Sequence, residues 1–262
     1  MAKQSQYLSV LIFIRQSLNA FLLACIISYF AGRYMSSSLP ADSELIENID
    51  LAPIQDSTYE KPFRFDYMGH SYNVDPQASY DINGLIVSHN NIHAWWDFDH
   101  DKTSVDIKDL CLIWGPNAKV KIFSNMSFFN ETTSCHYQQK KYIDGFEFDN
   151  TALSNNHLLS EDPLVRKTIQ DMRIGDQVHL TGYLVNYSDT RYPDFTRRSS
   201  LTRMDTAGGA CEVMLVTQAE ILKKGPRLWH NLYDFGNNFL LFAIILKVVY
   251  FCLYAWLEFK LS

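Results

Sequence analysis

The 262-residue sequence predicts an α+β fold: a β-rich, barrel-like extracytoplasmic domain with one clear helix, flanked by two transmembrane helices. Long apolar runs lie at both ends of the chain, short apolar runs alternate between them, and one helical pattern interrupts these. We divide the chain into an N-terminal transmembrane helix with an interfacial segment (1–35), an extended acidic stalk (36–62), a globular domain (63–222) and a juxtamembrane segment with a second transmembrane helix (223–262).

The first apolar run, residues 16–32, is bracketed by Arg15 and Arg33. At about 1.5 Å of rise per residue it covers about 25 Å, close to the thickness of the hydrocarbon layer. A cleaved signal peptide is the alternative, with Lys3 and Arg15 as its positively charged start. Arg33 and Tyr34 stand where small residues would be needed for cleavage, so we expect a retained helix.

The second apolar run, residues 239–257, is interrupted by Lys247 near its middle. A lysine at this depth costs about 2.5 to 3.5 kcal/mol on insertion. Two interpretations stay open: Lys247 makes an intramembrane polar contact with another helix, or the helix tilts and the side chain reaches the interface.

Charges near the spans favour one orientation. Lys3 and Arg15 precede the first span, whereas acidic residues follow Arg33. We therefore expect cytoplasmic termini and a translocated central domain. The basic residues near 223–227 argue for the opposite orientation.

Residues 34–237 hold 18 Lys and Arg against 28 Asp and Glu. Because nucleic-acid binding requires a basic face, we exclude nucleic acid as a partner. We also expect no cofactor, because the dinucleotide and phosphate-loop glycine patterns are absent.

Short apolar runs predict the strands of the central domain: 84–88, 110–114, 120–123, 177–187 and 211–217. The best alternation runs from Val178 to Leu184 and predicts a strand with one buried face. The single helix is predicted after Ser160 as N-cap, with Val165, Ile169 and Met172 on one face.

The roles of the cysteines allow several interpretations. Cys25 and Cys252 fall inside the spans, and a disulfide between Cys111 and Cys135 would close the shortest loop in the domain. Cys211 could act as a nucleophile with His157 or His179 as base, but a cysteine at the start of a strand is more often buried and inert.

Two polar clusters are candidate sites. His89, His93 and Asp97 could bind a metal, although their spacing matches no specific motif and a polar loop is the alternative. A basic cluster could bind an anion or an acidic partner, or could form a hairpin whose arginines pair with nearby carboxylates, which we favour; its members are Arg191, Arg197, Arg198 and Arg203.

The segments at 80–90, 104–115, 154–159, 174–185 and 197–212 resemble a family of uncharacterised bacterial membrane-associated proteins. The signature is RSSLxRxDxxxGACE, and this chain has Ala207 where the family pattern has a glycine. The resemblance implies a bacterial envelope protein and assigns no activity.

We therefore expect a two-pass protein of the bacterial inner membrane with a periplasmic domain, acting as a binding, scaffold or sensor subunit of an envelope assembly. Its partners would be the lipid bilayer and other membrane proteins or further copies of itself. The alternative is a membrane-tethered metal-dependent hydrolase.

Overall fold

The computed structural model describes residues 2–92, 103–131, 134–204 and 211–261. The chain forms two compact units, one made of its two ends (Met1–Ser37 and Pro226–Ser262) and one made of its centre (Ser38–Gly225).

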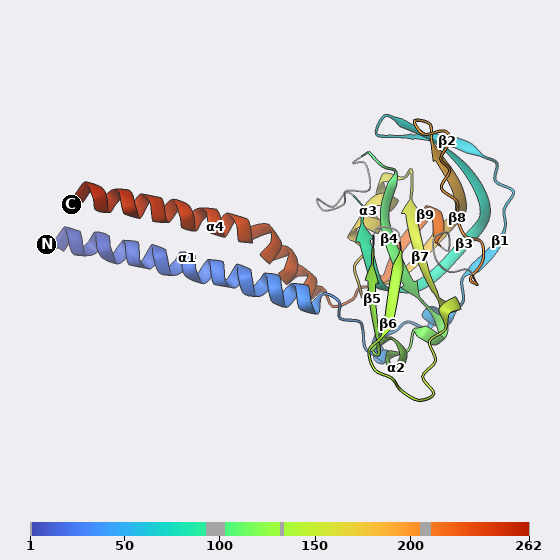
Figure 1. Cartoon of the computed structure of the whole chain (residues 1–262), viewed down its shortest axis with the longest axis horizontal. Helices are drawn as coiled ribbons and strands as arrows, with labels where there is room; N and C mark the ends of the chain where they lie inside the picture. Colours follow the sequence, from blue (N-terminus) through green and yellow to red (C-terminus); the bar gives the residue numbers. More distant parts are fainter. Residues whose placement is uncertain (1, 93–102, 132–133, 205–210, 262) are drawn as a thin grey trace. The chain divides into compact units, whose positions relative to one another are not determined.

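The terminal unit is a pair of long helices, α1 (Ala2–Met35) and α4 (Arg227–Leu261). They run side by side with both chain termini at the same end of the pair (Figure 1). Ser9–Met35 and Arg227–Lys260 are long and apolar enough to cross a membrane, which suggests a membrane protein. The expected interfacial segment before Arg15 is part of α1.

The central unit is built on a seven-stranded mixed sheet in the order β1-β3-β4-β7-β9-β8, with β2 paired to β3. The strands are β1 (Ile54–Ser57), β2 (Phe63–Tyr67), β3 (His70–Asn91), β4 (Asp106–Ile113), β7 (Leu153–Leu159), β8 (Gln177–Asp189) and β9 (Glu212–Lys223). β7 and β9 are parallel, and the other neighbours are antiparallel. The α+β class predicted from the sequence is confirmed.

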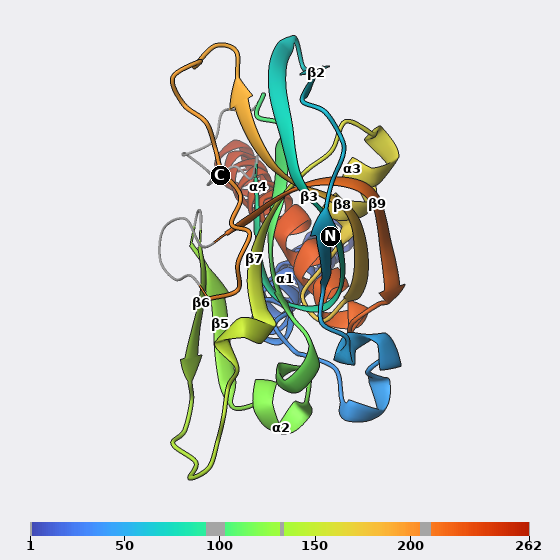
Figure 2. The same ribbon diagram turned by 90° about the vertical axis from the view of Figure 1, so that its right-hand side faces the viewer.

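β3 connects the two sides of this sheet. Its 22 residues curve strongly, pairing with β8 from Tyr72 to Leu85 and with β4 from Leu85 to Asn91 (Figures 1 and 2). Register shifts at Pro76/Ala78 and Ile86/Ser88 accompany this curvature, as expected for bulges. The pairings therefore run from β3 through β4, β7, β9 and β8 back to β3.

The main core lies on the inner face of these strands. Leu180 and Leu184 are fully buried there, whereas His179 and Thr181 are half-exposed, so the alternation predicted for β8 is confirmed. β4 differs because all of its residues are buried, which shows that both of its faces are covered.

Helix α3 (Pro163–Asp171) confirms the predicted helix, but Asp162 rather than Ser160 caps it. The Asp162 carboxylate accepts from the Leu164 amide at 2.7 Å, while the Ser160 hydroxyl donates to the Val216 carbonyl at 2.8 Å. The expectation of one clear helix in the domain is wrong, because the predicted strand at 120–123 is a helical turn, α2 (Val120–Phe123). A distant contact supports this turn: the Val120 amide donates to the Asp42 carboxylate at 2.9 Å.

The extended stalk expected at 36–62 is also wrong. This segment forms two 3₁₀ turns, η1 (Asp42–Glu44) and η2 (Glu47–Asp50), and then β1, which pairs with β3. Ile49 is buried, and the Gln177 side chain both accepts from the Ile46 amide at 2.7 Å and donates to the Glu44 carbonyl at 2.8 Å. The few apolar residues among the acidic ones therefore hold the segment on the domain.

A separate hairpin, β5 (Met126–Asn130) and β6 (Cys135–Gln139), follows the short turn η3 (Gly115–Asn117) and α2, and the turn η4 (Asn150–Ala152) precedes β7. Among the described strands, these two pair only with each other. A disulfide from Cys135 to Cys111 attaches it to β4.

Candidate functional site

A cavity of about 690 Å³ opens beside β7, and we call it the β7 cavity. It is bordered by the β5–β6 hairpin, the start of β7, the segment before β9 and the start of β9. Its lining residues are 134–137, 148–151, 153–155, 202–204 and 211–212. Polar and aromatic side chains therefore share its wall.

The strand period explains why reactive side chains gather here. Asp109 of β4 lies directly opposite His157 of β7, and Cys111 lies opposite Asn155. Residues two apart on a strand share a face, so these four side chains point to one side of the sheet. Leu110 and Leu158 belong to the core on the other side.

Asp109 and His157 form a buried pair, with Asp109 Oδ1 2.6 Å from His157 Nδ1 and side-chain exposures of 1% and 3%. Burial disfavours a charged ring, but hydrogen bonds with Asp109 and Cys211 outweigh it and raise the pKa of His157 to about 9. Asp109 therefore fixes the proton on Nδ1 and leaves Nε2 for a second partner.

Arg197 occupies the Nε2 side of the His157 ring. Arg197 Nη2 lies 2.6 Å from Nε2. Because a guanidinium only donates, this contact is a hydrogen bond only with the neutral ring. The charge of Arg197 also lowers the pKa of His157, opposing Asp109. The contact with Arg197 therefore belongs to the neutral form of the ring. The raised pKa of His157 favours the protonated form, in which Nε2 carries a proton and Arg197 must move away.

Cys211 remains a thiol, is partly exposed and lines the cavity. Burial raises the pKa of this thiol, but hydrogen bonds from His157 and Asn155 and the charges of His157 and Arg197 more than offset it, so the net pKa is lowered. Asn155 Nδ2 lies 3.4 Å from the sulfur, and Asn155 Oδ1 accepts from Asn130 at 3.2 Å. The hairpin thus orients the amide that faces the thiol.

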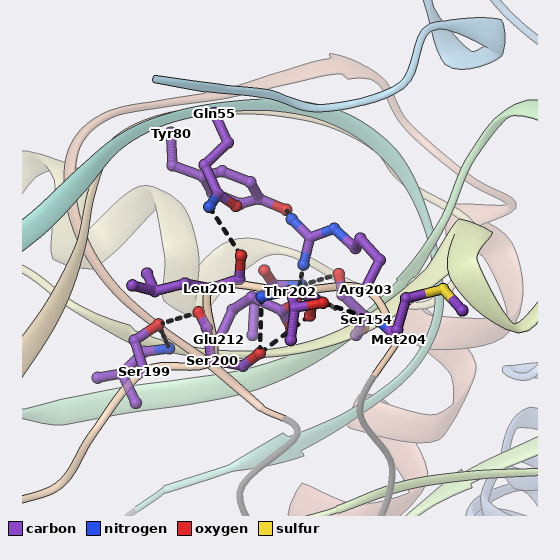
Figure 3. Close-up of polar contacts among 12 residues, drawn as sticks. Gln55, Tyr80, Ser154, Ser199, Ser200, Leu201, Thr202, Arg203, Met204 and Glu212 are labelled. Atoms are coloured by element: carbon purple, nitrogen blue, oxygen red, sulfur yellow. Dashed lines mark hydrogen bonds and ion pairs between the residues drawn. The ribbon is translucent and has the colours of Figure 1, made fainter. Parts of the chain in front are cut away.

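A second polar group surrounds Arg203. Its guanidinium contacts the Glu212 carboxylate and the Tyr80 hydroxyl, as Figure 3 shows. It also lies 5.1 Å from the ring centre of Tyr80 and 5.7 Å from that of Trp114. Within the described part of the chain, Glu212 Oε2 is buried without a hydrogen-bond partner.

The predicted arginine cluster does not act as one patch. Arg197 reaches His157 and Arg203 reaches Glu212. Arg191 pairs with Asp189 at 2.6 Å, whereas Arg198 is exposed beside a different hollow. Pairing with nearby carboxylates, the interpretation favoured from the sequence, therefore describes two of the four. Residues 205–210, where the hairpin considered from the sequence would turn, lie outside the described residues.

The predicted metal ligands are only partly described. His89 lies near the end of β3, while His93 and Asp97 fall outside the described residues. Among the residues that the structure describes, no group of three His, Cys, Asp or Glu could hold a metal ion. His179, the other base considered for Cys211, instead contacts Asp81 at 2.9 Å.

Lys247 finds its polar contact inside the chain. Its ammonium donates to the Asn19 side-chain oxygen on α1. Glycines allow the helices to approach: a Cβ at Gly32 would collide with the Tyr233 backbone, and one at Gly236 with Tyr29.

Sequence reasoning missed Asp109 and Asn155. Asp109 directly precedes the predicted strand 110–114, and the useful signal was an ionisable residue at the start of an apolar run. Comparisons of the chain with protein-family models, curated proteins and solved structures give no match.

Proposed function

We propose that this chain is a two-span subunit of a bacterial envelope assembly, whose periplasmic domain binds a partner through the β7 cavity. The observation that carries the proposal is the cavity itself: about 690 Å³, with polar and aromatic side chains in its wall. A concave site of this size, with a few polar groups that can orient a ligand, is the usual form of a binding site.

The strand order supports a binding role. We infer that the ring of pairings closes as a small five-stranded barrel in which the third strand, β7, lies parallel to the fifth, β9. This is the order of OB-type Greek-key barrels, which bind ligands on the face of their second and third strands and with the loop between strands four and five. In this chain those positions are β4, β7 and residues 190–211, and the β7 cavity is lined from β7 and from that loop. This support is an analogy of fold.

The acidic domain favours a protein or small polar ligand over nucleic acid, because a basic face is needed to neutralise phosphates. The bacterial inner membrane and periplasmic orientation rest on the resemblance and on the charges around the first span. The alternative, a metal-dependent hydrolase, gains no ligand set from the described residues.

Photo-crosslinking in intact cells tests the binding role. Benzoylphenylalanine replaces Met204, which lines the cavity and is 79% exposed, or Tyr59, which is 98% exposed and lies outside the cavity. We expect a discrete adduct with an envelope protein or a second copy of the chain from position 204 only. Identical adducts from both positions, or none from position 204, would refute the cavity as the binding site.

A further inference from the structure

One corner of the β7 cavity brings together Cys211, His157, Asp109 and Asn155. Binding of a partner does not by itself explain this arrangement. Asp109 and His157 are a 2.6 Å pair, and Asn155 donates toward the sulfur of Cys211 at 3.4 Å. These are a nucleophile, a base, a group that orients the base, and an amide donor beside the nucleophile.

We propose that Cys211 is the nucleophile of an acyl-transfer reaction on an ester or thioester bound in the β7 cavity. His157 takes the thiol proton, and Asn155 donates a hydrogen bond to the oxyanion. Asp109 is a positioning residue that holds the ring of His157. The inference rests on the proposed function in one respect, since the acyl group occupies the same cavity.

The step balances within the site and its substrate. The Cys211 S–H proton moves to His157 Nε2 while the sulfur attacks the acyl carbon, forming a C–S bond. The oxyanion accepts from Asn155 Nδ2, and collapse breaks the bond to the leaving alcohol or thiol, which takes the proton from Nε2. Water then attacks the acyl-cysteine with the same base and releases a carboxylic acid.

Arg197 must move away from His157 before the reaction can proceed. It donates to Nε2 at 2.6 Å, the nitrogen that receives the thiol proton. Once Nε2 is protonated, the two donors repel and Arg197 must leave, which carries its positive charge away from the ring. Its charge still lowers the pKa of Cys211 from nearby.

Acyl transfer fits this cysteine better than disulfide exchange. Disulfide exchange would require the Cys211 thiolate to attack the bond between Cys111 and Cys135, and Cys135 also lines the cavity. An oriented amide beside the sulfur serves an oxyanion, whereas disulfide exchange forms none. The wall of the cavity also offers apolar surface to an acyl chain, from Phe148, Leu153 and Met204.

The test uses the full-length protein in detergent with Cys25→Ala and Cys252→Ala, so that Cys211 is its single thiol. With p-nitrophenyl butyrate we expect a burst of p-nitrophenol equal to the protein concentration and a butyryl group on the Cys211 peptide. His157→Gln should slow the burst about 100-fold, the low end for loss of a general base. His179→Gln, which removes a histidine paired with Asp81 outside the cavity, should not change it.

Iodoacetamide alkylation against pH provides a second readout. Reference protein should alkylate with an acid limb below the ordinary thiol pKa of about 8.5, and Asp109→Asn should move that limb upward. Among the described residues, the ionisable groups around the thiol are His157 and Asp109 on the sheet and Arg197 beside the ring. Those in the cavity wall are His136, Tyr137, Asp149, Arg203 and Glu212.

Rapid alkylation without any butyryl adduct refutes acyl transfer and leaves a merely reactive thiol. An acid limb at the ordinary thiol pKa in the reference protein refutes the activated cysteine, even where His157→Gln fails to fold. The two proposals can also fail separately. If position 204 still crosslinks to a partner in Cys211→Ser, but the reference protein forms no butyryl-cysteine, then acyl transfer is refuted and the binding role stands.

Discussion

Arg203 and Glu212 place opposite charges inside the domain, with side-chain exposures of 21% and 3%. Removing both charges together costs little when apolar groups fill the space, but removing one leaves the other buried and uncompensated. We expect Arg203→Met to lower the free energy of unfolding by about 3 to 5 kcal/mol. Thermal unfolding in detergent measures this.

Arg198 provides the matched control, because it is exposed and lines a different hollow. Arg198→Met should change stability by less than about 0.5 kcal/mol. Equal effects of the two substitutions would mean that the Arg203 contact contributes nothing to the fold.

The residues of the candidate site show where sequence reasoning stops. Cys211 was recognised as a potential nucleophile, but His157 and His179 were equally available as bases. The parallel pairing of β7 with β9 joins segments more than 50 residues apart and brings His157 to Cys211, and no local pattern predicts such a pairing. β7 was not among the predicted strands, because Asn155, Asn156 and His157 are polar and give no apolar run, although both faces of this strand are covered.

One covalent link attaches the β5–β6 hairpin to the sheet. A two-stranded sheet is marginal alone, and the Cys111–Cys135 bond closes a loop of 24 residues. By the chain-entropy argument, such a loop corresponds to about 3 kcal/mol. We expect the double substitution Cys111→Ala and Cys135→Ala to lower the free energy of unfolding by about this amount.

Limited proteolysis should then cut first within the hairpin at 126–139, because the cavity wall loses its attachment to β4. The matched control replaces Cys25 and Cys252 instead, which removes two thiols without breaking a bond. Cleavage elsewhere in the domain, with the hairpin resistant, would show that side-chain packing holds it without the disulfide.

Helices α1 and α4 are joined by a polar contact from Lys247, near the middle of the second apolar run, to Asn19. The Tyr250 hydroxyl also donates to the Leu11 carbonyl at 3.0 Å. We expect a coupling of about 0.6 to 2 kcal/mol between Lys247→Leu and Asn19→Leu in a double-mutant cycle of detergent unfolding. Lys247→Leu should also leave the size of the purified particle unchanged, because the contact lies within one chain. A smaller particle would instead place the partner of Lys247 on a second subunit.

At the scale of the whole chain, the sequence predicted the elements that have a regular local pattern of apolar residues. It did not predict the elements whose structure depends on contacts with distant parts of the chain. The two apolar runs, the alternation of β8 and helix α3 were visible because each carries its own period. The segment at 36–62 has the composition of a linker, yet Ile49 and the Gln177 side chain hold it on the domain. A few contacts therefore place this segment on the domain, although its average composition is that of a linker.

The last prediction concerns membrane orientation, because any binding or acyl-transfer role depends on which compartment the domain meets. Both termini lie at one end of the helical pair, so one orientation fixes both (Figure 1). Arg15 precedes the first apolar run with Lys3, and acidic residues follow Arg33, which favours cytoplasmic termini. A periplasmic phosphatase fused after residue 100 should therefore be active in bacterial cells, and a cytoplasmic fluorescent reporter at the same point should stay dark. Swapping charges with Arg15→Glu and Glu44→Lys should reduce the phosphatase signal, because the first span usually sets topology. A dark phosphatase with a bright fluorescent reporter in the unaltered chain would place the β7 cavity in the cytoplasm and overturn the periplasmic assignment.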